Sequence, residues 1–134
     1  MPKPINIALI GSKFMGRVHS NAYLKASRFF DLSRTPVMHT VAARNVENLV
    51  AFSRRWGWRN FTDQWRLAVQ NPEIDLLDVA TPNHMHEEQA IAALEAGKHV
   101  VCEKPLAGTL QDARAMLRAA RKVPKQKTFV WYNY

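Results

Sequence analysis

Short apolar runs alternate along this chain with longer segments of helical character. Residues 5–10 (INIALI) are almost continuously apolar, contain β-branched side chains and are followed by Gly11, which is typical of a strand buried on both faces. Comparable strands are predicted at residues 37–43, 60–61, 74–80, 99–102 and 128–132. Because strands that alternate with helices favour parallel pairing, the chain is predicted to be an α/β protein whose doubly wound parallel sheet carries helices on both faces.

Helices are predicted between these strands, at residues 14–28, 46–56, 63–70, 84–96 and 110–122. Several follow a residue whose side-chain oxygen can accept a hydrogen bond from the first helical turn, namely Asn45, Thr62, Asn83 and Thr109. Gly57 and Gly97 follow two of the helices, at the position where a positive φ angle is favoured. These signals mark where the helices begin and end, and so indicate where the strands between them end.

The composition excludes several classes of protein. The chain has 134 residues, of which 47% are hydrophobic and 22% charged, enough for one domain with a sizeable core. No apolar run approaches the roughly 18 residues of a membrane-spanning helix, and the N-terminal apolar stretch fits a strand better than a signal peptide. Cys102 is the only cysteine, so no intrachain disulfide forms. We therefore expect a cytoplasmic protein without a membrane partner and without a metal site.

The net charge of +8 raises the possibility of a nucleic-acid partner. The basic residues are scattered, however, and the densest groups fall on expected helix faces and in a loop. No basic run is interleaved with stacking aromatic residues. Solvated helix faces explain the charge better, so no nucleic-acid partner is expected.

Parallel sheets bind ligands beyond the carboxyl ends of their strands. After the first strand the sequence reads Gly11, Ser12, Lys13, Phe14, Met15 and Gly16. The dinucleotide-binding pattern has glycine at the first, third and sixth positions, and here Lys13 replaces the middle glycine, which normally lets the backbone approach the pyrophosphate. Since the N–H groups of the following helix still favour an anion, we predict a phosphate site. Lys13 would either move the pyrophosphate outward or reduce the affinity for the cofactor.

The second strand ends without the acid that normally holds the adenosine ribose, and Arg44 follows it. A small residue followed by arginine leaves space and charge for a 2′-phosphate, which favours NADP. Arg44 could equally stack on adenine in an NAD site, or lie at a surface turn without a ligand.

Residues 100–108 (VVCEKPLAG) place Glu103 and Lys104 at the exit of a strand that is predicted to be buried. A charged pair is costly to bury unless it is paired or used. The residue after this pair is Pro105, whose ring fixes its own φ angle just beyond the strand. The two alternatives are a surface salt bridge in a loop and a functional pair that faces the ligand crevice.

Three segments, GSKFMGRVHSNAY, DVATPNHMHEEQAIAALEAGKHVVCEKPLAG and FVWYNY, together resemble the N-terminal domain of the Gfo/Idh/MocA oxidoreductases, the family of glucose–fructose oxidoreductase and inositol dehydrogenase. The resemblance covers the whole chain, and residues 78–106 are its specific part. It implies a Rossmann-type NAD(P)-binding domain over residues 1–134. It also implies a nicotinamide dinucleotide as partner and the oxidation or reduction of sugars, inositols or related polyols.

The resemblance assigns roles to the residues around Lys104. Lys104 is the expected catalytic residue, beside the nicotinamide, where it would stabilise charge on the reacting substrate oxygen or take part in proton transfer. Glu103 would contact the cofactor or orient the lysine, and Pro105 would aim it. Asn133 matches an asparagine that reaches the nicotinamide region.

A second group, Thr81, Pro82, Asn83 and His86, matches a T-P-N-x-x-H stretch that lines the cofactor. His86 lies one turn into the predicted helix, where it either points toward the ribose or the substrate or has a structural role. His19 also matches a family position and is expected to pack beneath the glycine turn. Cys102 is expected to be a small buried residue.

Members of this family carry a second α/β domain that supplies most of the substrate pocket and commonly the oligomer interface. That C-terminal substrate domain is not present in this chain, so we expect the cofactor-binding domain of a sugar or polyol dehydrogenase. Alone, it should be inactive, and a homo-oligomer is expected only with the missing domain. The alternative is a non-catalytic dinucleotide-binding or sensing module, which Lys13 suggests.

Overall fold

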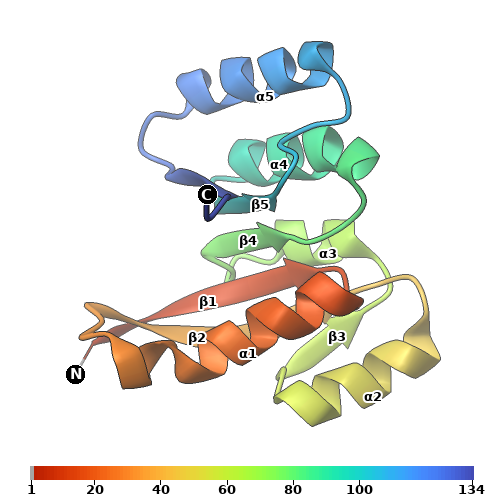
Figure 1. Cartoon of the computed structure of the whole chain (residues 1–134), viewed down its shortest axis with the longest axis vertical. Helices are drawn as coiled ribbons and strands as arrows, with labels where there is room; N and C mark the ends of the chain where they lie inside the picture. The colour runs from red at the N-terminus through yellow and green to blue at the C-terminus, as the bar shows by residue number, and fades with distance from the viewer. Residues whose placement is uncertain (1) are drawn as a thin grey trace.

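The computed structural model describes residues 2–134, which form a six-stranded sheet in the order β3-β2-β1-β4-β5-β6 (Figure 1). All neighbouring strands of this sheet pair in parallel. The order reverses beside β1, because the chain first builds outward to β3 and then crosses to β4 on the other side. Such a reversal is the point where an open α/β sheet forms its ligand crevice. The predicted doubly wound parallel sheet is confirmed.

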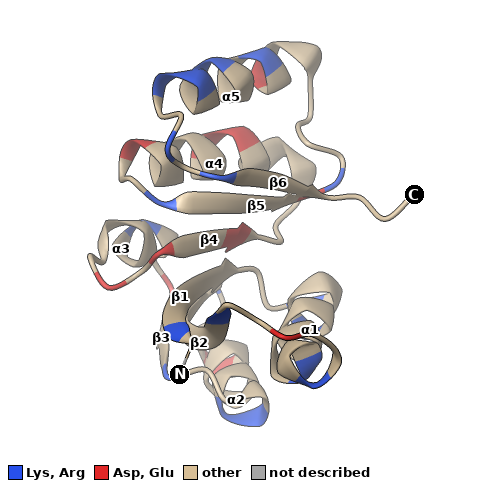
Figure 2. Cartoon of the chain, turned by 90° about the vertical axis from the view of Figure 1, so that its left-hand side faces the viewer, with Lys and Arg blue, Asp and Glu red and all other residues tan. Residues whose placement is uncertain are grey.

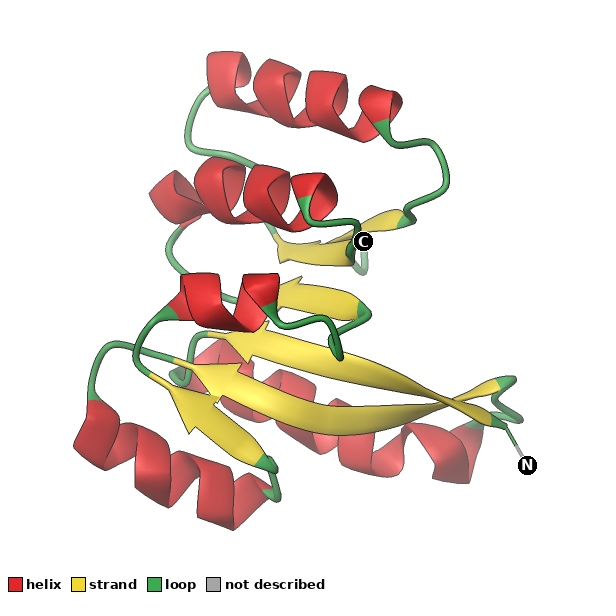
Figure 3. Ribbon diagram, turned by 180° about the vertical axis from the view of Figure 1, so that it is seen from behind, coloured by secondary structure: helices red, strands yellow, loops and turns green. Residues whose placement is uncertain are grey.

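The helices and strands follow one another in strict alternation, apart from one short 3₁₀ turn before α4 (Figure 3). In chain order the elements are β1 (Lys3–Ile10), α1 (Phe14–Phe29), β2 (Arg34–Ala42), α2 (Val46–Trp56), β3 (Asn60–Thr62), α3 (Trp65–Gln70), β4 (Leu76–Val79), η1 (Asn83–Met85), α4 (His86–Glu95), β5 (His99–Glu103), α5 (Leu110–Lys122) and β6 (Thr128–Trp131).

Two hydrophobic layers cover the two faces of the sheet. On one face, α3, α4 and α5 pack against side chains such as Ala8, Leu77 and Val100. On the other, α2 packs against alternate positions of the same strands, including Ile7 and Leu9, and α1 lies over this face as well. Figure 2 shows α1 and α3 on opposite sides of the sheet. The period-two alternation along β1 therefore divides its apolar run between two cores.

Most predicted boundaries agree with the structure. Asn45 caps α2 by accepting a hydrogen bond from the Asn48 amide at 2.9 Å, and Thr109 caps α5 in the same way. Gly57 adopts a φ angle of 80° at the end of α2. These agreements arise because a cap needs only local backbone geometry.

Three boundary predictions were wrong. β2 starts at Arg34, so Pro36 lies inside the strand rather than before it. Asn83 does not cap a helix: it opens the 3₁₀ turn η1, in which the Met85 amide bonds to the Pro82 carbonyl oxygen at 3.0 Å, and α4 follows. Thr62 accepts a hydrogen bond from the Gln64 amide in a preceding turn, so α3 starts later than predicted. In the last two cases a local turn replaces the first helical turn.

Candidate functional site

The carboxyl end of β1 meets the start of α1 at a turn that only glycine permits. Gly11 has a φ angle of 114°, and a Cβ atom there would overlap the carbonyl oxygen of Ala80. A Cβ atom on Gly16 would overlap the carbonyl oxygen of Gly11. Both glycines are therefore needed for the first turn of α1 to lie against the strand end. This close packing leaves the free N–H groups of the helix at the edge of the crevice.

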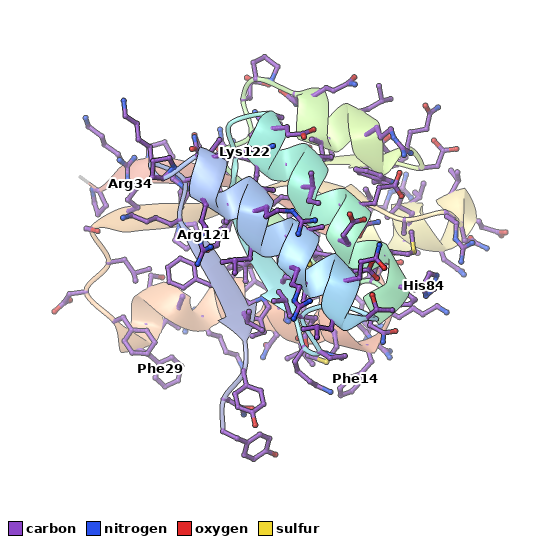
Figure 4. All side chains as sticks on the ribbon, turned by 90° about the horizontal axis from the view of Figure 1, so that it is seen from above. Phe14, Phe29, Arg34, His84, Arg121 and Lys122 are labelled. Atoms are coloured by element: carbon purple, nitrogen blue, oxygen red, sulfur yellow. The ribbon has the colours of Figure 1, made fainter. Side chains whose placement is uncertain are left out.

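The other residues of the turn leave its outer side open. Ser12 and Met15 are partly buried, whereas Lys13 and Phe14 are exposed. Phe14, the first residue of α1, points outward (Figure 4). Lys13 occupies the N-cap position of α1 in an extended conformation, and its side chain makes no capping hydrogen bond. The exposed lysine side chain therefore lies at the N-terminus of α1, on the open side of the glycine turn.

A buried polar network lies one helical turn further along α1. His19 is 5% exposed, and its Nδ1 lies 2.9 Å from Oδ2 of Asp78 on β4. Its Nε2 lies 2.8 Å from Oε1 of Glu103 at the end of β5. Asp78, which is fully buried, also accepts hydrogen bonds from the Tyr23 hydroxyl at 2.6 Å and from the Trp131 indole at 3.1 Å. The network therefore joins α1 to three neighbouring strands.

The charges of this network alter the titration of its members. Burial lowers the pKa of His19, but the hydrogen bonds and negative charges of Asp78 and Glu103 outweigh it, so the pKa is raised above its ordinary value. Burial and the charge of Asp78 raise the pKa of Tyr23 well above its usual range. Burial, together with the charges of Asp78 and Glu103, raises the pKa of Cys102 to about 12. The thiol of Cys102 is therefore neutral near neutral pH.

Glu103 and Lys104 differ sharply in environment. Glu103 is buried, binds His19, and accepts a hydrogen bond from the Lys104 backbone amide at 3.0 Å through its Oε2 atom. The Lys104 side chain is exposed and makes no hydrogen bond or ion pair with any residue between 2 and 134. The surface salt bridge considered for this pair is therefore absent from the described residues. The lysine ammonium is free to meet a ligand at the sheet edge.

The T-P-N segment is fixed to the loop that follows β5. His86 is 1% exposed; its Nε2 lies 2.8 Å from the Thr81 carbonyl oxygen, and its Nδ1 lies 2.9 Å from the Pro105 carbonyl oxygen. The Thr81 hydroxyl donates to Gln89 at 2.7 Å. Both nitrogens of His86 thus face backbone atoms inside the protein. Of the two alternatives for His86, this geometry favours the structural role over a contact with ribose or substrate.

The remaining predicted residues lie at the same edge of the sheet. Arg44 follows β2 and is exposed. Pro82 and Asn83 are exposed after β4, and Asn133 is exposed beyond β6. The structure therefore collects the predicted residues at the carboxyl ends of the strands, with the glycine turn at β1.

Three members of the buried network were not singled out from the sequence: Tyr23, Asp78 and Trp131. Asp78 carried a usable signal, because an acid within the apolar run of residues 74–80 must find partners when the strand is buried. Tyr23 and Trp131 carried no comparable signal. Aromatic residues on a helix and on a strand are more often ordinary core residues.

The described residues hold neither a metal cluster nor a membrane-spanning helix. Within residues 2–134, no group of three or more His, Cys, Asp and Glu side chains is arranged to hold a metal ion. In the same residues no helix has both the length and the apolar character to cross a membrane. A glycine turn and helix start at the switch point of a parallel sheet, with an exposed lysine at the same edge, are the features of a nucleotide-binding α/β protein of the Rossmann class.

The family model described as "Oxidoreductase family, NAD-binding Rossmann fold" (GFO_IDH_MocA) matches residues 5–133. The chain therefore belongs to the Gfo/Idh/MocA oxidoreductase family, as its motifs suggested.

Two curated relatives are sugar dehydrogenases by name. Levoglucosan dehydrogenase of Pseudarthrobacter phenanthrenivorans is 46% identical over 118 residues, which are 87% of this chain and 30% of that protein. D-glucoside 3-dehydrogenase of Escherichia coli K12 is 32% identical over 131 residues, which are 97% of this chain and 35% of that protein. The chain thus spans about a third of the length of these relatives.

Solved structures agree with this fold. A levoglucosan dehydrogenase in complex with NADH superimposes with a TM-score of 0.92 at 43% identity, over 96% of this chain and 34% of that one. The same enzyme is also known in complex with NADH and levoglucosan, again with a TM-score of 0.92.

Proposed function

We propose that this chain is the cofactor-binding part of an NAD(P)-dependent dehydrogenase that acts on a sugar, an inositol or a related polyol. The observation that carries the proposal is the free ammonium of Lys104 at the end of β5, on the same sheet edge as the glycine turn of β1. Only β4 separates these two strands, so their ends are about 10 Å apart at the usual strand spacing. A dinucleotide with its pyrophosphate at the turn can extend its nicotinamide toward β5.

The residues present fit such a cofactor. The close packing that Gly11 and Gly16 permit leaves the N–H groups of the first turn of α1 available to a pyrophosphate, with Ser12 to Met15 around them. Thr81 to Asn83 would line the middle of the cofactor, and Asn133 would approach the nicotinamide end. When bound, the nicotinamide supplies hydride transfer.

The chemistry of this chain would then reside mainly in Lys104. Its ammonium can donate a hydrogen bond to the reacting oxygen of the substrate and stabilise the negative charge that develops there as the proton leaves. Glu103 would help to position Lys104, because its carboxylate accepts a hydrogen bond from the Lys104 backbone amide. The similarity to relatives named as levoglucosan and glucoside dehydrogenases supports a sugar as the substrate class.

The choice between NADP and NAD depends on Arg44 in this proposal. The second strand lacks an acid for the ribose hydroxyls, and Arg44 is exposed there, which supports NADP. The similar levoglucosan dehydrogenase structure holds NADH, which supports the alternative in which Arg44 stacks on adenine. Both cofactors therefore belong in the test.

Titration of the chain with NADPH and NADH, followed by cofactor fluorescence, tests the proposal. Arg44→Ala should weaken NADPH binding by roughly 1–3 kcal/mol and NADH binding much less, because a charge-assisted contact is lost. Arg59→Ala, another exposed arginine, is the matched control. Equal losses for both cofactors would indicate adenine stacking, tighter NADH binding by the unaltered chain would refute the NADP preference, and no binding of either would refute the site.

Catalysis requires the longer protein that the relatives imply. There, Lys104→Ala should reduce kcat by roughly 100-fold or more while cofactor affinity changes little, since Lys104 acts on the substrate oxygen. The 134-residue chain should bind cofactor without turnover, and its homo-oligomers would depend on the further domain. We also propose a cytoplasmic location, which the unpaired Cys102 supports.

The second candidate function is a dinucleotide-binding or sensing module without chemistry. The position of Lys13 in the glycine turn favours it, because the side chain reduces access to the backbone there. No activity of the longer protein on sugars, inositols or polyols, despite cofactor binding, would favour this candidate.

A further inference from the structure

The buried network beneath the proposed site has a specific geometry. His19 is placed between two carboxyl groups, with Asp78 on Nδ1 and Glu103 on Nε2. A neutral imidazole has one N–H group and one acceptor nitrogen, so it cannot donate to both carboxylates. An imidazolium can, and it places one positive charge between two negative ones.

The surroundings of His19 favour this charged form. Asp78 already accepts from Tyr23 on α1 and Trp131 on β6, and Glu103 accepts from the Lys104 amide, so both acids act as acceptors toward their other partners. The centroid of the Trp131 ring lies 4.9 Å from that of the His19 ring, and the indole carries no charge. The neighbouring Cys102 is a neutral thiol near neutral pH. Asp78 and Glu103 are thus the charges that face His19.

We propose that His19, with both ring nitrogens protonated between Asp78 and Glu103, is a positioning residue that fixes Lys104 at the end of β5. The path is short: His19 holds Oε1 of Glu103, and Oε2 of the same carboxylate holds the Lys104 amide. When the ring loses the proton on Nε2, its hydrogen bond to Glu103 is lost. The Glu103 carboxylate then loses its orienting partner on α1, and the backbone of Lys104 becomes more mobile.

This inference rests on the proposed function, since the role of Lys104 belongs to that proposal, but it can be tested without cofactor or substrate. Nitrogen and proton NMR of the unaltered chain reports the protonation of the His19 ring. The expected result is an imidazolium at neutral pH. The hydrogen-exchange protection of the Lys104 amide should fall as this ring deprotonates at higher pH. A neutral His19 ring at neutral pH, or a protection factor that does not follow its titration, would overturn the proposal.

A matched pair of variants separates positioning from packing. The amide nitrogen of glutamine in His19→Gln can take the place of Nε2 and donate to Glu103, whereas that of asparagine in His19→Asn takes the place of Nδ1 and donates to Asp78. The Lys104 amide should be protected about tenfold less in His19→Asn than in His19→Gln, because only the latter retains the Glu103 bond. Equal protection in both folded variants would show that His19 acts through packing alone.

In the longer protein the same pair separates this inference from the proposed function. If Lys104→Ala lowers kcat, His19→Asn should lower kcat more than His19→Gln, with cofactor affinity unchanged in both. If Lys104→Ala leaves kcat unchanged, the catalytic role that the proposed function gives to Lys104 fails, while the NMR and exchange results still decide whether His19 positions the lysine backbone.

Discussion

His86 joins two segments that are distant in the sequence: its Nδ1 lies 2.9 Å from the Pro105 carbonyl oxygen and its Nε2 lies 2.8 Å from the Thr81 carbonyl oxygen. Thr81 lies just after β4 and Pro105 just after β5, so the ring links the loops that follow these two strands. The almost fully buried ring therefore packs between the two loops, within hydrogen-bond distance of one carbonyl group on each.

His86→Ala should therefore destabilise the chain. The change removes the hydrogen bonding between the ring and the two loops and opens a cavity, at a combined cost of about 3 kcal/mol in the free energy of unfolding. Urea unfolding measures this difference. His84→Ala is the matched control, since His84 is exposed and points away from the protein in Figure 4, and it should change stability by less than about 0.5 kcal/mol. Equal effects of the two substitutions would contradict the structural role.

The stability of the chain should fall as the pH rises above neutrality. Burial lowers the pKa of His19, but Asp78 and Glu103 outweigh it and raise the pKa above 6.5, so the folded chain holds this proton more tightly than the unfolded chain. Its contribution is fully present below about pH 6.5 and is lost as the pH rises through the folded pKa. Urea unfolding at a series of pH values measures this loss. His19→Gln should show a smaller decline over the same window, and an unchanged decline would assign the effect to other groups.

Cys102 should resist thiol reagents while the chain is folded. Burial, with the charges of Asp78 and Glu103, raises its pKa from 9.0 to about 12, so the thiolate fraction near pH 8 falls roughly a thousandfold. The rate of reaction with a chromogenic disulfide reagent measures this directly. Unfolding in guanidinium chloride is the control and should restore rapid reaction. Rapid labelling of the folded chain would show that this part of β5 opens frequently.

Lys13→Gly should tighten cofactor binding. Glycine at this position permits a closer approach of the backbone to the pyrophosphate, and relief of steric interference is worth about 1–3 kcal/mol. Lys13→Ala removes the charge but keeps a Cβ atom, so it separates charge from bulk. Titration with NADPH and NADH at low and high salt measures both effects. If both variants bind more weakly, and the loss shrinks at high salt, the charge of Lys13 contributes to binding and the steric argument is wrong.

Much of the fold could be predicted from the sequence, because the relevant forces act locally. The apolar runs alternate with amphipathic segments, and Gly11, Gly57 and Gly97 lie where the chain needs a positive φ angle. Asn45 and Thr109 bond to amides three residues away. The same local reasoning failed at Asn83, where a 3₁₀ turn precedes α4, because that turn and an N-cap start from similar sequences.

The sequence also determined which residues meet at the sheet edge, since parallel strands bring their carboxyl ends together. It could not determine the partners of Glu103. From the motif, Glu103 and Lys104 looked like a pair of charges, but the carboxylate turns inward to His19 and the ammonium turns outward. Strand alternation sends neighbouring residues to opposite sides, and the register of α1 over β4 and β5 then supplies the inward partner.

The tertiary structure alone decided the ionisation state that we infer for His19. Asp78, Glu103 and His19 are far apart in the chain, and no spacing rule relates them. They interact because the His19 side chain of α1 reaches Asp78 on β4 and Glu103 on β5, two strands that pair side by side in the sheet. Burial there removes water, so two carboxylates can hold a proton on a histidine that would release it more readily in solvent.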